Sequence, residues 1–297
     1  MAEAARDMWA RWVLEKRDSG GDPELVEAGL EWLRAVRDRV LANADVTEGD
    51  VLLDVGTGDG LIGFGAHPLV GESGRVFFSD VSEQLVEHCR GLAANSNVGD
   101  RCQFIVASAD NLSNVPDGAV DVVTTRSVLI YVKDKARAFR EFFRVLRPGG
   151  RLSIFEPINR FGYPEPEDRF IGYDVAPVVD LARKVWAVYH RLQPPEDPML
   201  DFDERDLLAF VAAAGFSEIR LDLEVRIERS PWSAGRSWDA FLRTSGNPRL
   251  PPIAEVLDEA LNAEERKRFS AHLRPLVEQS QGTSRLAVCY LWAVKHA

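Results

Sequence analysis

Cysteine is scarce in this 297-residue sequence. Its three cysteines, Cys89, Cys102 and Cys289, are too few and too widely separated for a disulfide framework or a C-x-x-C metal site. We expect each of them to be a small apolar core residue. Because no constellation of acidic residues suggests a metal either, the sequence predicts no metal site and favours catalysis without a metal ion.

Long apolar runs and an excess of basic residues are also missing. No stretch approaches the roughly 18 consecutive apolar residues of a membrane span, and the N-terminal residues do not resemble a signal peptide. These absences predict a cytoplasmic protein without a membrane partner. Acidic residues outnumber basic ones by 47 to 36, which gives a net charge of −11. Because such a charge repels phosphate backbones, no nucleic-acid partner is expected.

What the sequence does contain is an alternation of short apolar runs with amphipathic stretches. Apolar runs occupy 51–55, 75–80, 102–107, 120–125 and 151–156, and helical patterns lie at about 60–70, 82–95 and 134–146. Strands that alternate with helices imply parallel pairing, right-handed crossovers and a sheet covered on both faces. The sequence therefore predicts a doubly wound α/β fold.

A glycine-rich turn follows the first apolar run, in the sequence LLDVGTGDG at 52–60. A strand, a glycine turn and a helix bring backbone N–H groups and a positive helix end close to a ligand, and glycine is needed where a Cβ would block the approach. The alternating glycines Gly56, Gly58 and Gly60 therefore predict a ligand site.

The residues Gly58 to Gly63 also satisfy the dinucleotide fingerprint G-x-G-x-x-G. In that fingerprint the first glycine makes the turn directly after the strand. Here the turn begins at Gly56, two residues after Asp54, so we expect a carboxylate to face the place of a diphosphate. S-adenosylmethionine, which carries an ammonium and a sulfonium, suits a negative pocket better, and a nicotinamide cofactor is the alternative.

Two further acidic residues follow the next strands. Asp80 ends the second apolar run, where its carboxylate could bind both ribose hydroxyls, although this spacing would also fit a nicotinamide cofactor. Asp110 follows the third run and could accept a hydrogen bond from an adenine amino group. Arg17 is a candidate partner of the methionine carboxylate. Together these residues favour S-adenosylmethionine.

Five motifs in order carry a family resemblance: VLLDVGTGDG, FFSDVS, ASADNLSNVPDGAVDVV, RSVLIYVKDKARAFREFFRVLRPGGRLSIFEP and DLLAFVAAAGF. Over residues 48–228 the chain resembles the class I S-adenosylmethionine-dependent methyltransferases, particularly the branch with the ubiquinone/menaquinone-type small-molecule enzymes. The resemblance implies a Rossmann-like sheet of seven strands in the order 3-2-1-4-5-7-6. The long segment between strands six and seven departs from the family pattern.

With this resemblance, the sequence divides into six segments. We predict an N-terminal helical lid at 1–47, a cofactor-binding core at 48–156, a substrate-cap insertion at 157–202, a continuation of the core at 203–229, a helical insertion at 230–283 and a last core strand at 284–297.

The resemblance also implies a set of cofactor-binding residues. These residues would bind S-adenosyl-L-methionine, and S-adenosyl-L-homocysteine would be the product after methyl transfer. The implied contacts are Asp54, Gly56, Gly58 and Gly60 around the methionine part, Asp80 at the ribose, Val81 on the adenine, Ala109 and Asp110 at the adenine edge, and Arg126 on the methionine side.

Methyl transfer depends on alignment more than on one catalytic residue type, so the catalytic residues are harder to predict. Candidate bases or acceptor-binding groups are Tyr131, Glu156 and His190. Glu156 ends the fifth strand, at the sheet edge where open α/β folds bind ligands. For Glu156 and His190 a purely structural role is a competing interpretation.

The sequence thus predicts an enzyme that methylates oxygen, nitrogen or carbon of a small molecule or short peptide in biosynthetic tailoring. Two alternatives are a nicotinamide-dependent oxidoreductase and a catalytically silent binding module with the same fold. The sequence leaves open whether the protein forms a homodimer.

Overall fold

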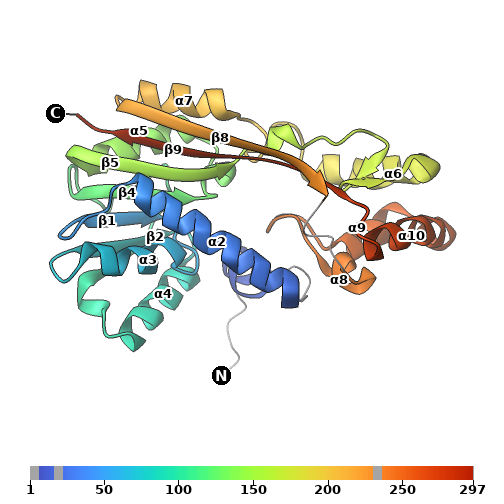
Figure 1. Ribbon diagram of the computed structural model, residues 1–297, viewed down its shortest axis with the longest axis horizontal. Helices are drawn as coiled ribbons and strands as arrows, with labels where there is room; N and C mark the ends of the chain where they lie inside the picture. Colours follow the sequence, from blue (N-terminus) through green and yellow to red (C-terminus); the bar gives the residue numbers. More distant parts are fainter. Residues whose placement is uncertain (1–6, 17–22, 230–235, 297) are drawn as a thin grey trace.

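The structure is a computed structural model that describes residues 7–16, 23–229 and 236–296. Its centre is a seven-stranded sheet with the order β3-β2-β1-β4-β5-β9-β8 (Figure 1). The strands are β1 (Val51–Val55), β2 (Arg75–Asp80), β3 (Cys102–Val106), β4 (Val120–Arg126), β5 (Leu146–Pro157), β8 (Ser217–Arg229) and β9 (Thr283–Val294). The first five strands are parallel, and β9 is antiparallel to both of its neighbours. The predicted fold and strand order are confirmed, with β8 and β9 as the sixth and seventh strands.

Helices cover both faces of the sheet. The helices are α2 (Pro23–Asn43), α3 (Leu61–Val70), α4 (Glu83–Asn95), α5 (Lys135–Val145) and α7 (Glu204–Ala213). Leu52 packs into a core with α2 and α3, whereas Leu53 packs into a core with α5 and α7 on the opposite face. Both residues are fully buried, as expected for a central strand that is covered by helices on both faces.

The N-terminal helical prediction needs a correction. Within the helical segment predicted at 1–47, the first described part is not a regular α-helix throughout but a short α1 (Met8–Arg11) followed by the π-helical segment η1 (Trp12–Lys16). Asp7 caps α1 through backbone N–H groups of Trp9 and Ala10 and also accepts a hydrogen bond of 2.6 Å from the Ser82 hydroxyl. This contact ties the N-terminal segment to the end of β2.

The start of the fifth strand is also corrected. The sequence predicts a strand from Arg151, but β5 begins at Leu146. Leu146 pairs with Val120 and Arg151 with Val122, so the residues between them bulge out of the ladder. The bulge is held because the Gly149 N–H donates to the Lys295 carbonyl at 2.6 Å.

The two insertions form a second packed unit, which we call the cap lobe. It contains the two-stranded β6 (Arg169–Phe170) and β7 (Tyr173–Asp174) and the helices α6 (Val179–Leu192), α8 (Trp238–Arg243), α9 (Ile253–Ala260) and α10 (Ala263–Glu278). Phe170, Phe241 and Phe269 are fully buried in its core. The long strands β8 and β9 lead from the sheet to this lobe (Figure 1). None of the described helices is both long and apolar enough to cross a bilayer.

Candidate functional site

A pocket of about 940 Å³ lies along the carboxyl edge of the parallel strands. The residues at or just beyond the ends of β1 to β5 contribute to its lining: Gly56, Asp80, Ala107, Arg126 and Pro157. The strand order reverses between β1 and β4, and open α/β sheets bind ligands at such switch points. The volume is within the range of sites for cofactor-sized ligands.

Asp54 lies beneath the glycine turn and does not line this pocket. Its carboxylate accepts hydrogen bonds from the hydroxyls of Thr57 at 2.7 Å and Thr124 at 3.1 Å and from the Gly63 N–H at 3.1 Å. Burial raises the pKa of Asp54 to about 6, and these hydrogen bonds act in the opposite direction. The expected orientation toward the ligand is therefore not observed, because Asp54 organises the turn from below.

Gly56 is required by its backbone and by its neighbour. Its φ of +66° favours glycine, and an added Cβ would lie 2.2 Å from Val128 of the loop after β4. Gly58 and Gly60 also have positive φ values. They belong to the same turn but are not among the residues that line the pocket. The glycine turn and the loop after β4 are thus packed against each other.

Asp80 faces the pocket at the end of β2. It accepts hydrogen bonds from the backbone N–H groups of Gly58 at 3.0 Å and Ser82 at 2.9 Å. Burial raises the pKa of its carboxyl, and these two hydrogen bonds lower it. Because carboxylate oxygens accept several hydrogen bonds, Asp80 retains acceptor capacity toward a ligand.

The structure brings several predicted cofactor-binding residues together in this pocket. Arg17 lies outside the described residues. The predicted residues that line the pocket are Gly56, Asp80, Val81, Ala109, Asp110 and Arg126.

Among the described residues, the lining has more negative than positive groups, partly through other residues than the sequence suggested. The described carboxylates are those of Glu15, Asp59, Asp80 and Asp110, and the described cations are Arg126 and Lys133. Asp59 lies inside the glycine motif, so its position was a usable signal, whereas Glu15 reaches the pocket only through the folding of η1. Across residues 7–16, 23–229 and 236–296, no group of three or more histidine, cysteine, aspartate or glutamate side chains is arranged to hold a metal ion.

Glu156 holds the loop after β4 and does not line the pocket. The loop turns at Ser127, which has a φ of +55°. Glu156 is fully buried, and its carboxylate accepts from the N–H groups of Val128 at 2.9 Å, Leu129 at 3.0 Å and Ile130 at 3.3 Å. Burial raises the pKa of Glu156 to about 7. Its position makes it an anchor of this loop.

Tyr131 is the one predicted catalytic candidate that lines the pocket. It ends the short helix η3 (Leu129–Tyr131), and its ring meets the Trp9 ring edge-on with centroids 4.9 Å apart. Burial, and then the charge of Glu156, raise the pKa of the Tyr131 phenol. His190 lies in α6, where its ring packs beside Trp186, outside the pocket.

The sequence did not reveal another, largely aromatic part of the pocket lining, which we call the aromatic lining. It is formed by residues of the N-terminal helices, of the segments after β4 and β5 and of the two insertions: Trp9, Trp12, Trp32, Tyr131, Asn159, Met199 and Gly246. Their sequence neighbourhoods indicate ordinary amphipathic helices or loops. Only the tertiary structure brings them together.

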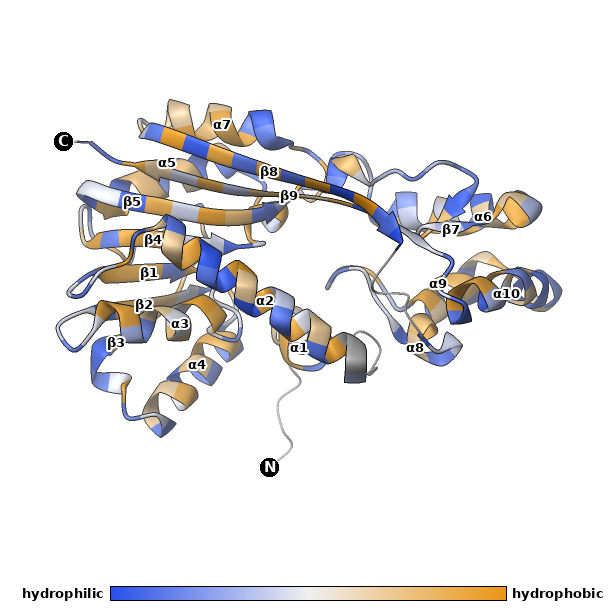
Figure 2. Ribbon diagram, in the orientation of Figure 1, coloured by the Kyte–Doolittle hydropathy of each residue, from blue (hydrophilic) through white to orange (hydrophobic). Residues whose placement is uncertain are grey.

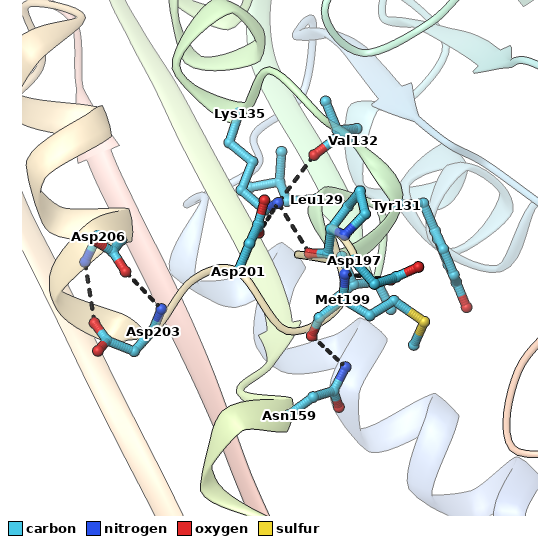
Figure 3. A network of polar contacts seen from close by, with 12 residues as sticks. Leu129, Tyr131, Val132, Lys135, Asn159, Asp197, Met199, Asp201, Asp203 and Asp206 are labelled. Carbon is cyan, nitrogen blue, oxygen red and sulfur yellow. Dashed lines mark hydrogen bonds and ion pairs between the residues drawn. The ribbon is translucent and has the colours of Figure 1, made fainter. Parts of the chain in front are cut away.

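A buried lysine fixes the segment that carries Met199 (Figure 3). The Lys135 ammonium donates to the carbonyls of Val132 and Pro198, each at 3.0 Å, and to the Asp201 carboxylate at 2.6 Å. The Asn159 amide donates to the Met199 carbonyl at 3.1 Å. These bonds tie the segment before α7 to the rim of the pocket.

Replacing Lys135 with methionine should lower the free energy of unfolding by about 2 kcal/mol, because it leaves two carbonyls and Asp201 without their cation. The expected loss is moderate because the Asp201 side chain is 33% exposed, whereas that of Lys135 is 3% exposed. Urea denaturation measures the change. In the control, Lys184→Met removes the surface pair with Glu265 and should cost at most about 1 kcal/mol. Equal losses would contradict the assigned role of Lys135.

The comparisons with known proteins agree with this geometry. A family profile described as a methyltransferase domain matches residues 46–167. The ubiquinone/menaquinone biosynthesis C-methyltransferase of Cronobacter sakazakii is 30% identical over 181 residues, which are 59% of this chain and 69% of that protein. The enzyme of the same name from a Marinomonas strain is 32% identical over 48% of this chain and 55% of its own length.

A solved structure supports the fold. The crystal structure of a putative methyltransferase from Bacillus halodurans aligns with a TM-score of 0.52 at 16% identity, over 88% of this chain and 99% of that one. At this identity the likeness concerns the fold alone. The sequence relationship to the Cronobacter enzyme carries the classification, and this chain belongs to the class I S-adenosylmethionine-dependent methyltransferases.

Proposed function

We propose that the protein transfers the methyl group of S-adenosylmethionine to a small-molecule acceptor with a flat, apolar body. The observation that carries the proposal is that the acidic residues after β2 and β3 and the aromatic lining belong to one pocket. A donor and an acceptor that share one pocket can be aligned for direct transfer.

The residues at the β2 and β3 end fit the cofactor. Asp80 has acceptor capacity for ribose hydroxyls, Asp110 could accept from the adenine amino group, and Val81 offers an apolar surface with half of its side chain exposed. The cofactor supplies a methyl group that the positive sulfur makes electrophilic. In the proposed arrangement, the negative lining attracts this cation, and the loop after β4 fixes the direction of attack.

In this proposal the acceptor binds at the aromatic lining, which suits an aromatic ring. The indoles of Trp9, Trp12 and Trp32, the Tyr131 ring and Met199 present large apolar surfaces that pack well against a planar molecule. Because the cofactor would share the same volume of about 940 Å³, the remaining space favours a small molecule over a peptide.

Proton transfer can be assigned in part. With its raised pKa, Tyr131 stays protonated near neutral pH, so it would donate a hydrogen bond that orients the acceptor. Glu156 is unsuited as a base because its oxygens already hold three backbone N–H groups. The acceptor should therefore be nucleophilic by itself. The curated relatives are named as carbon methyltransferases of quinone biosynthesis, and by analogy we propose a biosynthetic role.

The alternative with a nicotinamide cofactor is less favoured. A diphosphate at the β1 turn would lie in a pocket whose described lining has four carboxylates and two cations. Repulsion of like charges in such a partly buried site opposes binding.

The decisive experiment incubates the purified protein with S-adenosylmethionine labelled in its methyl group and a panel of phenols, hydroquinones and naphthols. Mass spectrometry should detect product carrying the labelled methyl, together with stoichiometric S-adenosylhomocysteine. Calorimetry on the same preparation should detect binding of S-adenosylmethionine and not of NAD. The proposal fails if NAD binds and S-adenosylmethionine does not.

Tyr131→Phe should reduce kcat/KM for such an acceptor by about 5- to 10-fold, the equivalent of one lost hydrogen bond. The Kd for S-adenosylmethionine should not change, because Tyr131 belongs to the aromatic lining, where the acceptor is proposed to bind. Steady-state kinetics and calorimetry separate the two effects. Tyr163→Phe, in the cap insertion and outside the pocket lining, is the matched control. An equal loss in both variants would argue against a direct contact of Tyr131.

A further inference from the structure

The outermost strand β8 has one edge to which no other described strand is paired. It spans Ser217–Arg229, and its neighbour in the sheet is β9 (Figure 1). The pairing of β5 with β9 reaches only as far as Pro157 and Val288. Beyond that point, residues 225–229 of β8 and 283–287 of β9 continue as a two-stranded ribbon.

The two edges of this ribbon differ. The β9 edge is covered by the cap insertion, since the Ile158 N–H donates to the Ala287 carbonyl at 2.8 Å and the Thr283 N–H donates to the Gly172 carbonyl at 3.0 Å. Among the described residues, no strand hydrogen-bonds to the outer edge of β8. The strand has no proline, and its one register shift is confined to 217–220. A long, regular edge of this kind is a template for another strand.

The two faces of β8 alternate strictly, as the bands in Figure 2 show. One face is apolar, and on it Leu223, Val225 and Ile227 are 42%, 47% and 57% exposed. The other face is charged with both signs, and its residues are Arg220, Asp222, Glu224, Arg226 and Glu228. Exposed apolar side chains at successive positions of one face favour a partner that covers them.

We propose that β8 pairs with β8 of a second copy of this chain, antiparallel and about a twofold axis at Glu224. In an antiparallel pair, directly opposite residues lie on the same face, so charged positions must meet charged positions. With the axis at Glu224, Arg220 lies opposite the partner's Glu228, and Asp222 lies opposite the partner's Arg226. Symmetry repeats both ion pairs.

The apolar face is complementary in the same register. Leu221 lies opposite the partner's Ile227, and Leu223 lies opposite the partner's Val225. The two Glu224 side chains meet at the axis. Each is already paired with Arg39 of its own chain, which also binds Asp222 at 2.8 Å, so their repulsion is compensated.

Neighbouring registers are less favourable. An axis at Leu223 sets Arg220 against Arg226 and Asp222 against Glu224, and an axis at Val225 sets Asp222 against Glu228. Each of these pairs joins like charges, which destabilises a sheet. An axis at Asp222 would bring Ile227 against Ser217, within the register shift. Charge complementarity and regular pairing therefore agree only on Glu224.

The test uses charge reversal in the full chain, with mass measured by light scattering during gel filtration. The wild type should be dimeric, and Arg220→Glu or Glu228→Arg alone should weaken dimerisation at least tenfold by creating like-charge pairs at both ends. An equimolar mixture of the two variants should dimerise again, because opposite charges then meet at both ends. The double variant should behave in the same way.

Controls separate pairing from folding. Glu218→Arg reverses a charge of the same strand outside the paired span and should leave the dimer intact. Thermal melting of every variant checks the fold. A monomeric wild type at tens of micromolar, a dimer that neither single variant weakens, or a mixture that stays monomeric would each overturn the proposal.

Discussion

Replacing Asp80 with alanine is expected to weaken the binding of S-adenosylmethionine by about 10- to 100-fold. The reason is the loss of a carboxylate that faces the pocket with acceptor capacity left for the ribose, since hydrogen bonds to charged groups contribute about 1.5–3 kcal/mol. Isothermal titration calorimetry with S-adenosylmethionine and S-adenosylhomocysteine measures the change.

The control for this prediction is His190→Ala, which alters a side chain in α6 outside the pocket. Its affinity should match that of the wild type. Because Asp80 also binds the Gly58 N–H, thermal melting without ligand must show that the variant folds. Unchanged affinity in a folded Asp80→Ala protein would remove Asp80 from the proposed cofactor site.

Glu156→Ala is expected to lower the free energy of unfolding by roughly 3 kcal/mol and to reduce methyl transfer strongly. The substitution leaves the three N–H groups of Val128, Leu129 and Ile130 without their acceptor in a buried place. The loop they belong to carries Tyr131 and lies against Gly56. Its release should therefore disturb both the aromatic lining and the glycine turn. Urea denaturation and a methyl-transfer assay check both effects. A fully stable variant would show that the anchor is dispensable.

Glu156 also predicts a dependence of stability on pH. Its pKa of about 7 in the folded protein lies above the ordinary 4.5, so between these values the folded state retains a proton that the unfolded chain has lost. The stability from this group is fully present below about pH 4.5 and is lost as the pH rises through 7, by up to roughly 3 kcal/mol. The stability difference between the wild type and Glu156→Gln should therefore fall from pH 5 to pH 8.

Glu141 is a control with the opposite sign. Hydrogen bonds from Arg144 lower the pKa of Glu141, so its contribution is lost only as the pH falls below its ordinary range. The difference between the wild type and Glu141→Gln should be flat from pH 5 to pH 8. A similar slope for both variants would exclude Glu156 as the source.

The sequence alone was sufficient to predict the fold and several residues that line the pocket. Apolar runs reflect local periodicity. For this reason β1 and β2 begin and end at the residues predicted for them. Motif order was sufficient to place Gly56, Asp80 and Asp110 at neighbouring strand ends, because parallel strands present their carboxyl ends at one edge of a sheet. These inferences need no knowledge of side-chain packing.

The tertiary structure decided which groups face the pocket. Asp54 and Glu156 both lie near the end of a strand, yet each turns inward to hydrogen-bond donors, because a buried carboxylate must find donors. The aromatic lining of the pocket joins side chains such as Trp12 and Met199, which are far apart in the sequence. Periodicity reports how one element is buried, but the contacts between distant elements form only when the whole chain packs.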